Sequence, residues 1–134
     1  MRTSFSLTLS ALALGLLTAA CGSSNALAPK WQPQVTNTPN VKFAFQATGL
    51  TDVSDVVSYN WSCSSGNVII HPATTTTSGT ILLTIKDGGG VVRYNGTVPA
   101  SGDIDLATFA GGTWNIKVTL TNYSGTINFE VQQQ

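Results

Sequence analysis

Hydrophobic and polar residues alternate with a period of two through most of the chain beyond residue 40. The clearest alternating runs are residues 41–47, 57–63, 114–120 and 127–131. Such alternation is typical of strands with one buried and one solvated face. No stretch beyond residue 20 holds a helical period for three turns, so the pattern predicts an all-β domain.

Turn-forming residues divide these runs. Gly49 is expected to end the first strand, and residues 87–90 (Asp-Gly-Gly-Gly) supply positive-φ positions for a tight reversal. The returning strand, residues 91–98, is expected to hold a bulge at Asn95 and Gly96. The turn at residues 122–125 predicts that the last two runs form a hairpin.

Three shorter segments complete the expected strands. Residues 68–70 are apolar, residues 103–106 are suited to the edge of a sandwich, and the Thr-rich residues 73–78 are either an edge strand or a loop. About seven or eight strands with turns every eight to twelve residues indicate a single antiparallel two-sheet β-sandwich, jelly-roll or Ig-like. A small closed barrel is the alternative.

The N-terminus has a different character. A cationic start (Met1-Arg2-Thr3) precedes an apolar run at residues 5–20 that is broken by Ser, Thr and Gly. A membrane-spanning helix needs about 20 mostly apolar residues, so this run is short for one. A signal peptide at residues 1–20 fits better; a retained anchor helix or a core helix is the alternative.

Cys21 follows Leu-Thr-Ala-Ala at residues 17–20. This resembles the lipobox of bacterial lipoproteins, with Thr18 in place of the commonest leucine; ordinary secretory cleavage after Ala20 is the alternative. The resemblance implies that Cys21 carries diacylglycerol and an acylated amino group, and several acyl chains hold a protein stably on a membrane. Gly22 resembles the outer-membrane sorting pattern, which implies a lipid-anchored protein of the bacterial cell envelope at the outer membrane.

Residues 21–40 show no hydrophobic period and contain Pro29, Pro33 and Pro39, so a flexible tether is expected between lipid and domain. Trp31 is the exception, placed either in the lipid headgroups or against the domain. The expected organisation is a signal peptide (1–20), a lipidated cysteine with tether (21–40) and a β-sandwich (41–134).

Charge excludes one class of partner. Without residues 1–20 the chain keeps five bases against six acids, a net charge of about −1, and no basic patch is present for nucleic acid. Charged residues make up 9% of the chain. Cys63 shares a strand phase with Tyr59 and Trp61, which predicts a buried thiol; with Cys21 lipidated it has no disulfide partner.

The segments 79–88 and 111–118, which begin with Gly, and 124–131, which begins with Ser-Gly, resemble the C-terminal half of bacterial pre-peptidase C-terminal jelly-roll domains. The resemblance covers residues 79–131 and implies a β-sandwich with an accessory or binding role.

Candidate chemistry is sparse. The single histidine, His71, has no Cys or His at ligand spacing and no triad partner, so no catalytic residue and no cofactor are assigned. Asp103 and Asp105 share a strand face and, with Asp87 across a loop, are candidate calcium ligands, although calcium takes six to eight oxygens. Solvated edge charges are the alternative.

Aromatic side chains offer a second kind of site. Tyr94 and Tyr123 fall off the apolar phase or in a turn, and with Trp31 they are candidates for a sugar-stacking surface. The sequence therefore predicts a lipid-anchored envelope protein whose non-catalytic sandwich contacts proteins or surfaces. A carbohydrate-binding module is the first alternative, with a polysaccharide partner. A calcium-stabilised accessory domain of an envelope or secreted enzyme system is the second.

Overall fold

The computed structural model describes residues 31–64 and 66–134, so the expected signal peptide and Cys21 lie outside the described residues. The described part is all-β, and every strand pair is antiparallel. Its strands are β1 (Gln34–Thr38), β2 (Lys42–Cys63), β3 (Gly66–Pro72), β4 (Thr75–Lys86), β5 (Val92–Gly96), β6 (Ile104–Phe109) and β7 (Gly112–Gln133). Within this part of the chain no helix could span a membrane.

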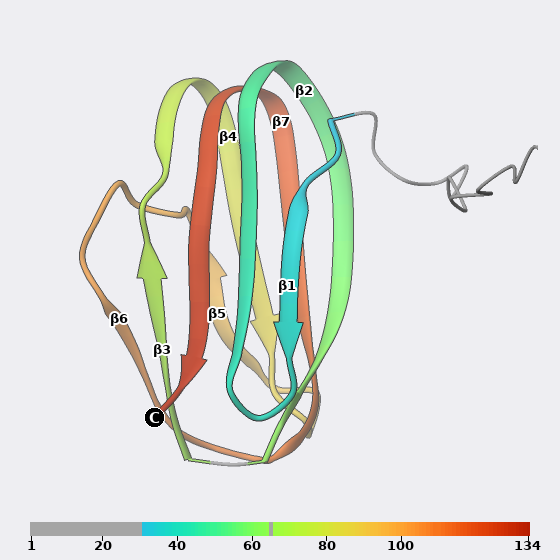
Figure 1. The fold of residues 1–134 in the computed structure, drawn as a ribbon, viewed down its shortest axis with the longest axis vertical. Coiled ribbons are helices and arrows are strands. Elements are labelled where there is room, and N and C mark those ends of the chain that lie inside the picture. The colour runs from blue at the N-terminus through green and yellow to red at the C-terminus, as the bar shows by residue number, and fades with distance from the viewer. Residues whose placement is uncertain (1–30, 65) are drawn as a thin grey trace, which may run out of the picture.

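Two long strands, β2 and β7, fold over and take part in both layers of the sandwich (Figure 1). Residues 42–47 of β2 pair with residues 127–132 of β7, and β1, β3 and β6 extend this first sheet. Residues 55–63 of β2 pair with residues 112–120 of β7, and β4 and β5 extend the second sheet. The predicted antiparallel sandwich is confirmed.

The connections at the top of the sandwich differ from the prediction. Residues 122–125 do not form a hairpin, because β7 runs on from one sheet into the other. Asn122 (φ 46°) and Gly125 (φ 143°) bend the strand without reversing it, and Tyr123 between them is fully buried. Gly49 likewise does not end its strand: β2 continues through register shifts between residues 47 and 55.

Several local predictions can be compared with the strands. β1 lies inside the segment 21–40 expected as a tether, where it pairs with β2 in regular register. The Thr-rich segment supplies the start of β4. The reversal at residues 87–90 is confirmed by the hydrogen bond from Gly90 N to Asp87 O at 2.9 Å. The prediction of a bulge at Asn95 and Gly96 is wrong, since the register shift falls between Ile85 and Lys86, opposite residues 92–94.

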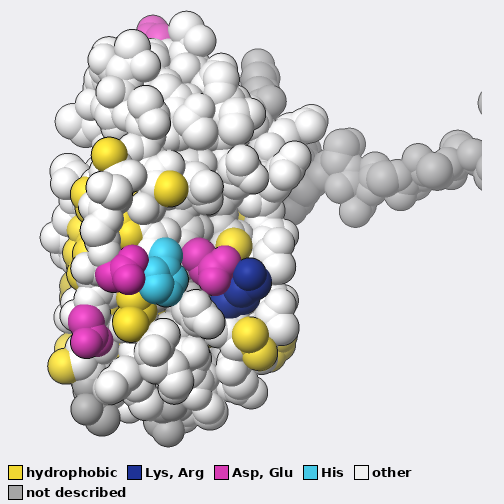
Figure 2. Space-filling model, turned by 60° about the vertical axis from the view of Figure 1, so that its left-hand side comes forward, with side chains coloured by type: hydrophobic (Ala, Val, Ile, Leu, Met, Phe, Trp, Pro, Cys, Tyr) yellow, Lys and Arg dark blue, Asp and Glu magenta, His cyan; other side chains and the backbone are white. Residues whose placement is uncertain are grey.

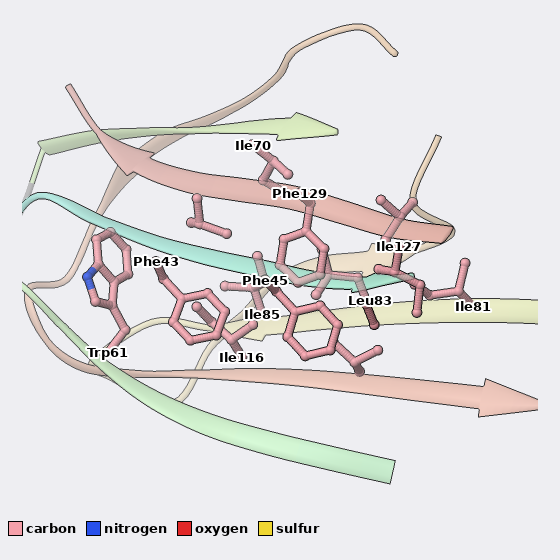
Figure 3. Close-up of a cluster of buried hydrophobic side chains, with 14 of the residues drawn as sticks. Phe43, Phe45, Trp61, Ile70, Ile81, Leu83, Ile85, Ile116, Ile127 and Phe129 are labelled. Carbon is pink, nitrogen blue, oxygen red and sulfur yellow. The ribbon is translucent and has the colours of Figure 1, made fainter. Parts of the chain in front are cut away.

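The core lies between the two sheets and is rich in aromatic rings (Figure 3). Phe45 and Phe129 pair across β2 and β7 and stack with ring centroids 5.3 Å apart. Trp61 and Trp114 meet edge to face at 5.8 Å. Cys63 is buried, as predicted, with Sγ 3.4 Å from Gln133 Oε1. Within the described residues every buried side-chain nitrogen and oxygen has a hydrogen-bond partner.

Candidate functional site

The three candidate calcium ligands are not brought together. Asp87 is buried in the β4–β5 turn, where its carboxylate accepts hydrogen bonds from Arg93 Nε (2.6 Å) and from the backbone N–H groups of Gly89 and Val91. Asp103 instead contacts His71, with Nδ1 and Oδ1 2.7 Å apart. Across residues 31–64 and 66–134, no three His, Cys, Asp or Glu side chains form a group that could hold a metal ion.

The contacts of Asp87 stabilise the β4–β5 turn. Desolvation by burial would by itself raise its pKa, but the hydrogen bonds from Arg93, Val91 and Gly89 and the charge of Arg93 together hold the pKa below its usual value. The Arg93 guanidinium also lies over the Phe109 ring, 4.9 Å from its centroid. The pair therefore links the β4–β5 turn to the end of β6.

The two candidate tyrosines do not form a surface with Trp31. Tyr123 is fully buried, and the carbonyl oxygens of Thr75 and Thr126, each 3.3 Å away, are the acceptors for its one hydroxyl hydrogen. Tyr94 lies in β5, which belongs to the second sheet, and its hydroxyl donates to Thr97 O at 2.6 Å. Burial raises the pKa of Tyr94. The expectation that three exposed aromatic rings form one stacking surface is wrong.

Trp31 docks on the domain. Its indole ring packs edge to face on Phe45 at 5.9 Å, and its Nε1–H donates to Asp55 Oδ2 at 3.0 Å. The other Asp55 oxygen accepts from Val56 N at 2.8 Å, so the carboxylate that holds the indole is itself fixed. Trp31 stays partly exposed at the edge of the sandwich. Burial, followed by the nearby Asp55 charge, raises the pKa of Tyr59 behind it.

Trp31 lines two shallow hollows. One, of about 150 Å³, is lined by Trp31 and by the uncharged polar residues Gln32, Gln34, Gln46 and Thr48. The other, wider and more open at about 410 Å³, is lined by Trp31, Val53, Ser54 and Asp55. The partly buried Trp31 ring thus borders one hollow that is lined by amide groups and a second that is lined by a carboxylate and a hydroxyl.

The amide-lined hollow continues over the outer face of the first sheet. A neighbouring hollow of about 110 Å³ shares Gln34 and Gln46 and reaches Asn128. The strand register places these three side chains in one row, because Gln34 pairs with Gln46 and Gln46 pairs with Asn128. We call Trp31 together with this row the Trp31 groove. Gln46 and Asn128 fall on the polar phase of predicted strands, a signal that any solvent-facing residue shares, and Gln34 lies in a segment without a period.

Charged side chains gather farther across the same face (Figure 2). Glu130 pairs in register with His71, and its Oε2 lies 2.9 Å from Lys42 Nζ. Asp103 lies on the other side of His71, and Asp105, two residues after Asp103, lies in β6. His71 therefore lies between Glu130 and Asp103 in a row of ionisable side chains.

No protein-family model matches this chain, and no curated protein matches it. Among solved structures, it is similar to a carbohydrate-binding module of Cellvibrio mixtus lichenase 5A in complex with cellotriose (19% identity, 77% of this chain and 86% of that chain, TM-score 0.43). It is also similar to a chain in the crystal structure of accessory secretory proteins 1, 2 and 3 of Streptococcus pneumoniae (9%, 81% and 90%, TM-score 0.41). A third is the C-terminal carbohydrate-binding module of LamC, a marine laminarinase of Zobellia galactanivorans (14%, 79% and 95%, TM-score 0.37). At these identities and scores, none of the three assigns a function to this chain.

Proposed function

We propose that this domain is a non-catalytic module that binds an uncharged glycan in the Trp31 groove. The observation that supports the proposal is the partly exposed Trp31 ring beside an amide-lined hollow. A sugar ring presents C–H groups on its faces and hydroxyls around its rim. An aromatic face packs on the C–H groups, and amides both donate to and accept from the hydroxyls.

The groove is prepared for binding before a ligand arrives. Trp31 is held by Phe45 and by Asp55, so little side-chain freedom remains to be lost when a sugar stacks on it. The hollows are small and shallow and lie end to end along the face. This shape suits a segment of an extended chain better than an isolated monosaccharide enclosed on all sides.

The proposal includes attachment to the bacterial cell envelope through a lipid on Cys21. Its support is the sequence at residues 17–21, which resembles a lipobox. The chain between Cys21 and Trp31 spans at most about 35 Å when fully extended. The groove would therefore stay close to the membrane and would meet glycans of the envelope or of its immediate surroundings.

Replacing Trp31 by alanine is expected to weaken glycan binding about 30-fold, equivalent to about 2 kcal/mol, because the stacking surface is lost. The measurement is titration calorimetry with soluble β-glucan, xylan, mannan and chitin oligosaccharides. Tyr94→Ala is the matched control, since it removes an aromatic ring from the second sheet and should leave the affinity unchanged. Absence of binding to every oligosaccharide, or equal affinity of wild type and Trp31→Ala, contradicts the proposal.

Replacing Cys21 by alanine is expected to release the protein from the membrane fraction, because the thioether to diacylglycerol cannot form. Fractionation of expressing cells and intact mass of the purified protein measure the effect. Cys63→Ala is the control, since that thiol is buried in the domain. A Cys21→Ala protein that stays membrane-bound with no loss of lipid mass rules out the anchor.

A further inference from the structure

The outer face of the second sheet carries two lysines. We call it the basic face; it is formed by Val56, Ser58, Leu82, Thr84, Lys86 and Lys117. Lys117 pairs with Ser58 on one side and with Thr84 on the other, while Lys86 lies on the next row. Positions related diagonally across a strand pair are about 7–8 Å apart, so the two lysines are neighbours on this face.

No negative charge neutralises these lysines. Strands β4 and β5 and residues 112–120 of β7 contain no Asp or Glu, and Asp55 of β2 is bound to Trp31 at the sheet edge. Within the described residues the ion pairs involve Lys42, His71 and Arg93, and neither Lys86 nor Lys117 takes part in one. The basic face thus has a net charge of about +2 from two lysines.

The opposite face of the sandwich has the opposite sign. That face carries one base, Lys42, and three acids, Asp103, Asp105 and Glu130 (Figure 2). Its net charge is about −2 when His71 is counted as neutral. The Trp31 groove opens on this acidic side, since Gln34, Gln46 and Asn128 belong to the first sheet. The domain is therefore an electrostatic dipole with the groove on the negative side.

We propose that the basic face lies on the anionic phospholipid headgroups of the membrane that holds the chain, and that this turns the Trp31 groove outward. This inference rests on the proposed lipid anchor. Each lysine near an anionic surface favours contact about fivefold (about 1 kcal/mol), so two lysines give about thirtyfold. That is too little to recruit a free protein but enough to orient a tethered one, because the tether keeps the domain at a high effective concentration near the surface.

Two other features also favour an orientation with the basic face on the membrane. Val56 and Leu82 are exposed to 57% and 38%, and they lie in one row of the basic face, on either side of Thr119. Small aliphatic side chains of this kind can pack among headgroups. The acidic face is repelled by the same lipids, so the two faces differ more strongly in membrane preference than the lysines alone would make them.

The test uses the chain from Cys21 onward, coupled through the Cys21 thiol to a maleimide-headgroup lipid. The vesicles are phosphatidylcholine alone or phosphatidylcholine mixed with phosphatidylglycerol. Because the coupling is chemical, the result does not depend on whether cells lipidate Cys21, and Cys63 is buried away from the reagent. Acetylation of each lysine with a water-soluble reagent is followed by mass spectrometry.

Lys86 and Lys117 are expected to react at least tenfold more slowly on the anionic vesicles, while Lys42 on the acidic face keeps its rate. The protection should vanish at about 1 M salt, where the screening length is about 3 Å. Lys86→Gln should reduce the protection of Lys117 about fivefold. The matched control Lys42→Gln removes the same charge from the other face and should leave the protection intact.

Three outcomes overturn the inference. Equal rates on both kinds of vesicle show that the lipids do not orient the domain, and protection of Lys42 shows that the wrong face is in contact. Protection of Lys86 and Lys117 in vesicle-free protein at the same concentration shows contact with a second copy instead. Glycan binding by a Lys86→Gln/Lys117→Gln variant, measured in solution, should equal that of wild type, which separates this inference from the proposed groove.

Discussion

Gly79→Ala is expected to destabilise the domain by more than about 4 kcal/mol, a large fraction of the stability of a domain this size. Gly79 adopts φ 72° where β4 crosses the bend of β7. A Cβ there would overlap the carbonyl oxygen of Asn122 and lie 2.6 Å from that of Thr121. Both obstacles are backbone atoms of the strand that carries the chain between the sheets, so neither can move aside cheaply.

Gly90→Ala is the matched control for this substitution. Gly90 has nearly the same φ, 79°, but a Cβ at that position meets no atom within 4 Å. The control should therefore show only the backbone penalty, about 1–2 kcal/mol. Urea unfolding of both variants gives the comparison. If the two substitutions reduce the free energy of unfolding equally, close packing at the β4–β7 crossing is not what requires glycine.

The strand phases could be predicted from sequence because burial follows alternation directly. Phe43, Phe45, Trp61 and Trp114 all fall on the apolar phase, and all are fully buried. The connections could not be predicted in the same way. A hairpin and a single strand that bends into the opposite sheet both give two alternating runs separated by turn residues. Residues 122–125 are compatible with either connection.

Of the candidate site, the sequence pointed only to Trp31. Trp31 stood out as an aromatic residue in a polar segment, but its position depends on contacts with Phe45 and Asp55, which lie 14 and 24 residues away in sequence. The amide row could not be predicted, because Gln34 and Gln46 become neighbours only through the pairing of β1 with β2. β1 itself was missed because it contains a single apolar residue, Val35, and so has no period to detect.

Phe45→Ala is expected to cost about 3–5 kcal/mol of stability and also to weaken glycan binding. Phe45 is fully buried and contacts Phe129, Tyr59 and Trp31, so its ring connects the core to the groove. Without it the indole loses its edge-to-face support and gains freedom that a ligand must remove. We expect the affinity for the oligosaccharides to fall about tenfold, equivalent to about 1.4 kcal/mol.

Phe43→Ala separates the two effects. Phe43 is equally buried and contacts Tyr59 and Phe129, but none of its ring contacts in the described residues is with Trp31. Its removal should lower the free energy of unfolding by about 3–5 kcal/mol, as is usual for a buried phenylalanine. The glycan affinity should not change. Unfolding by urea and calorimetry well below the unfolding midpoint measure the two quantities. If both variants bind as wild type does, Phe45 does not position Trp31; if both lose affinity equally, the groove responds to core stability rather than to the Trp31–Phe45 contact.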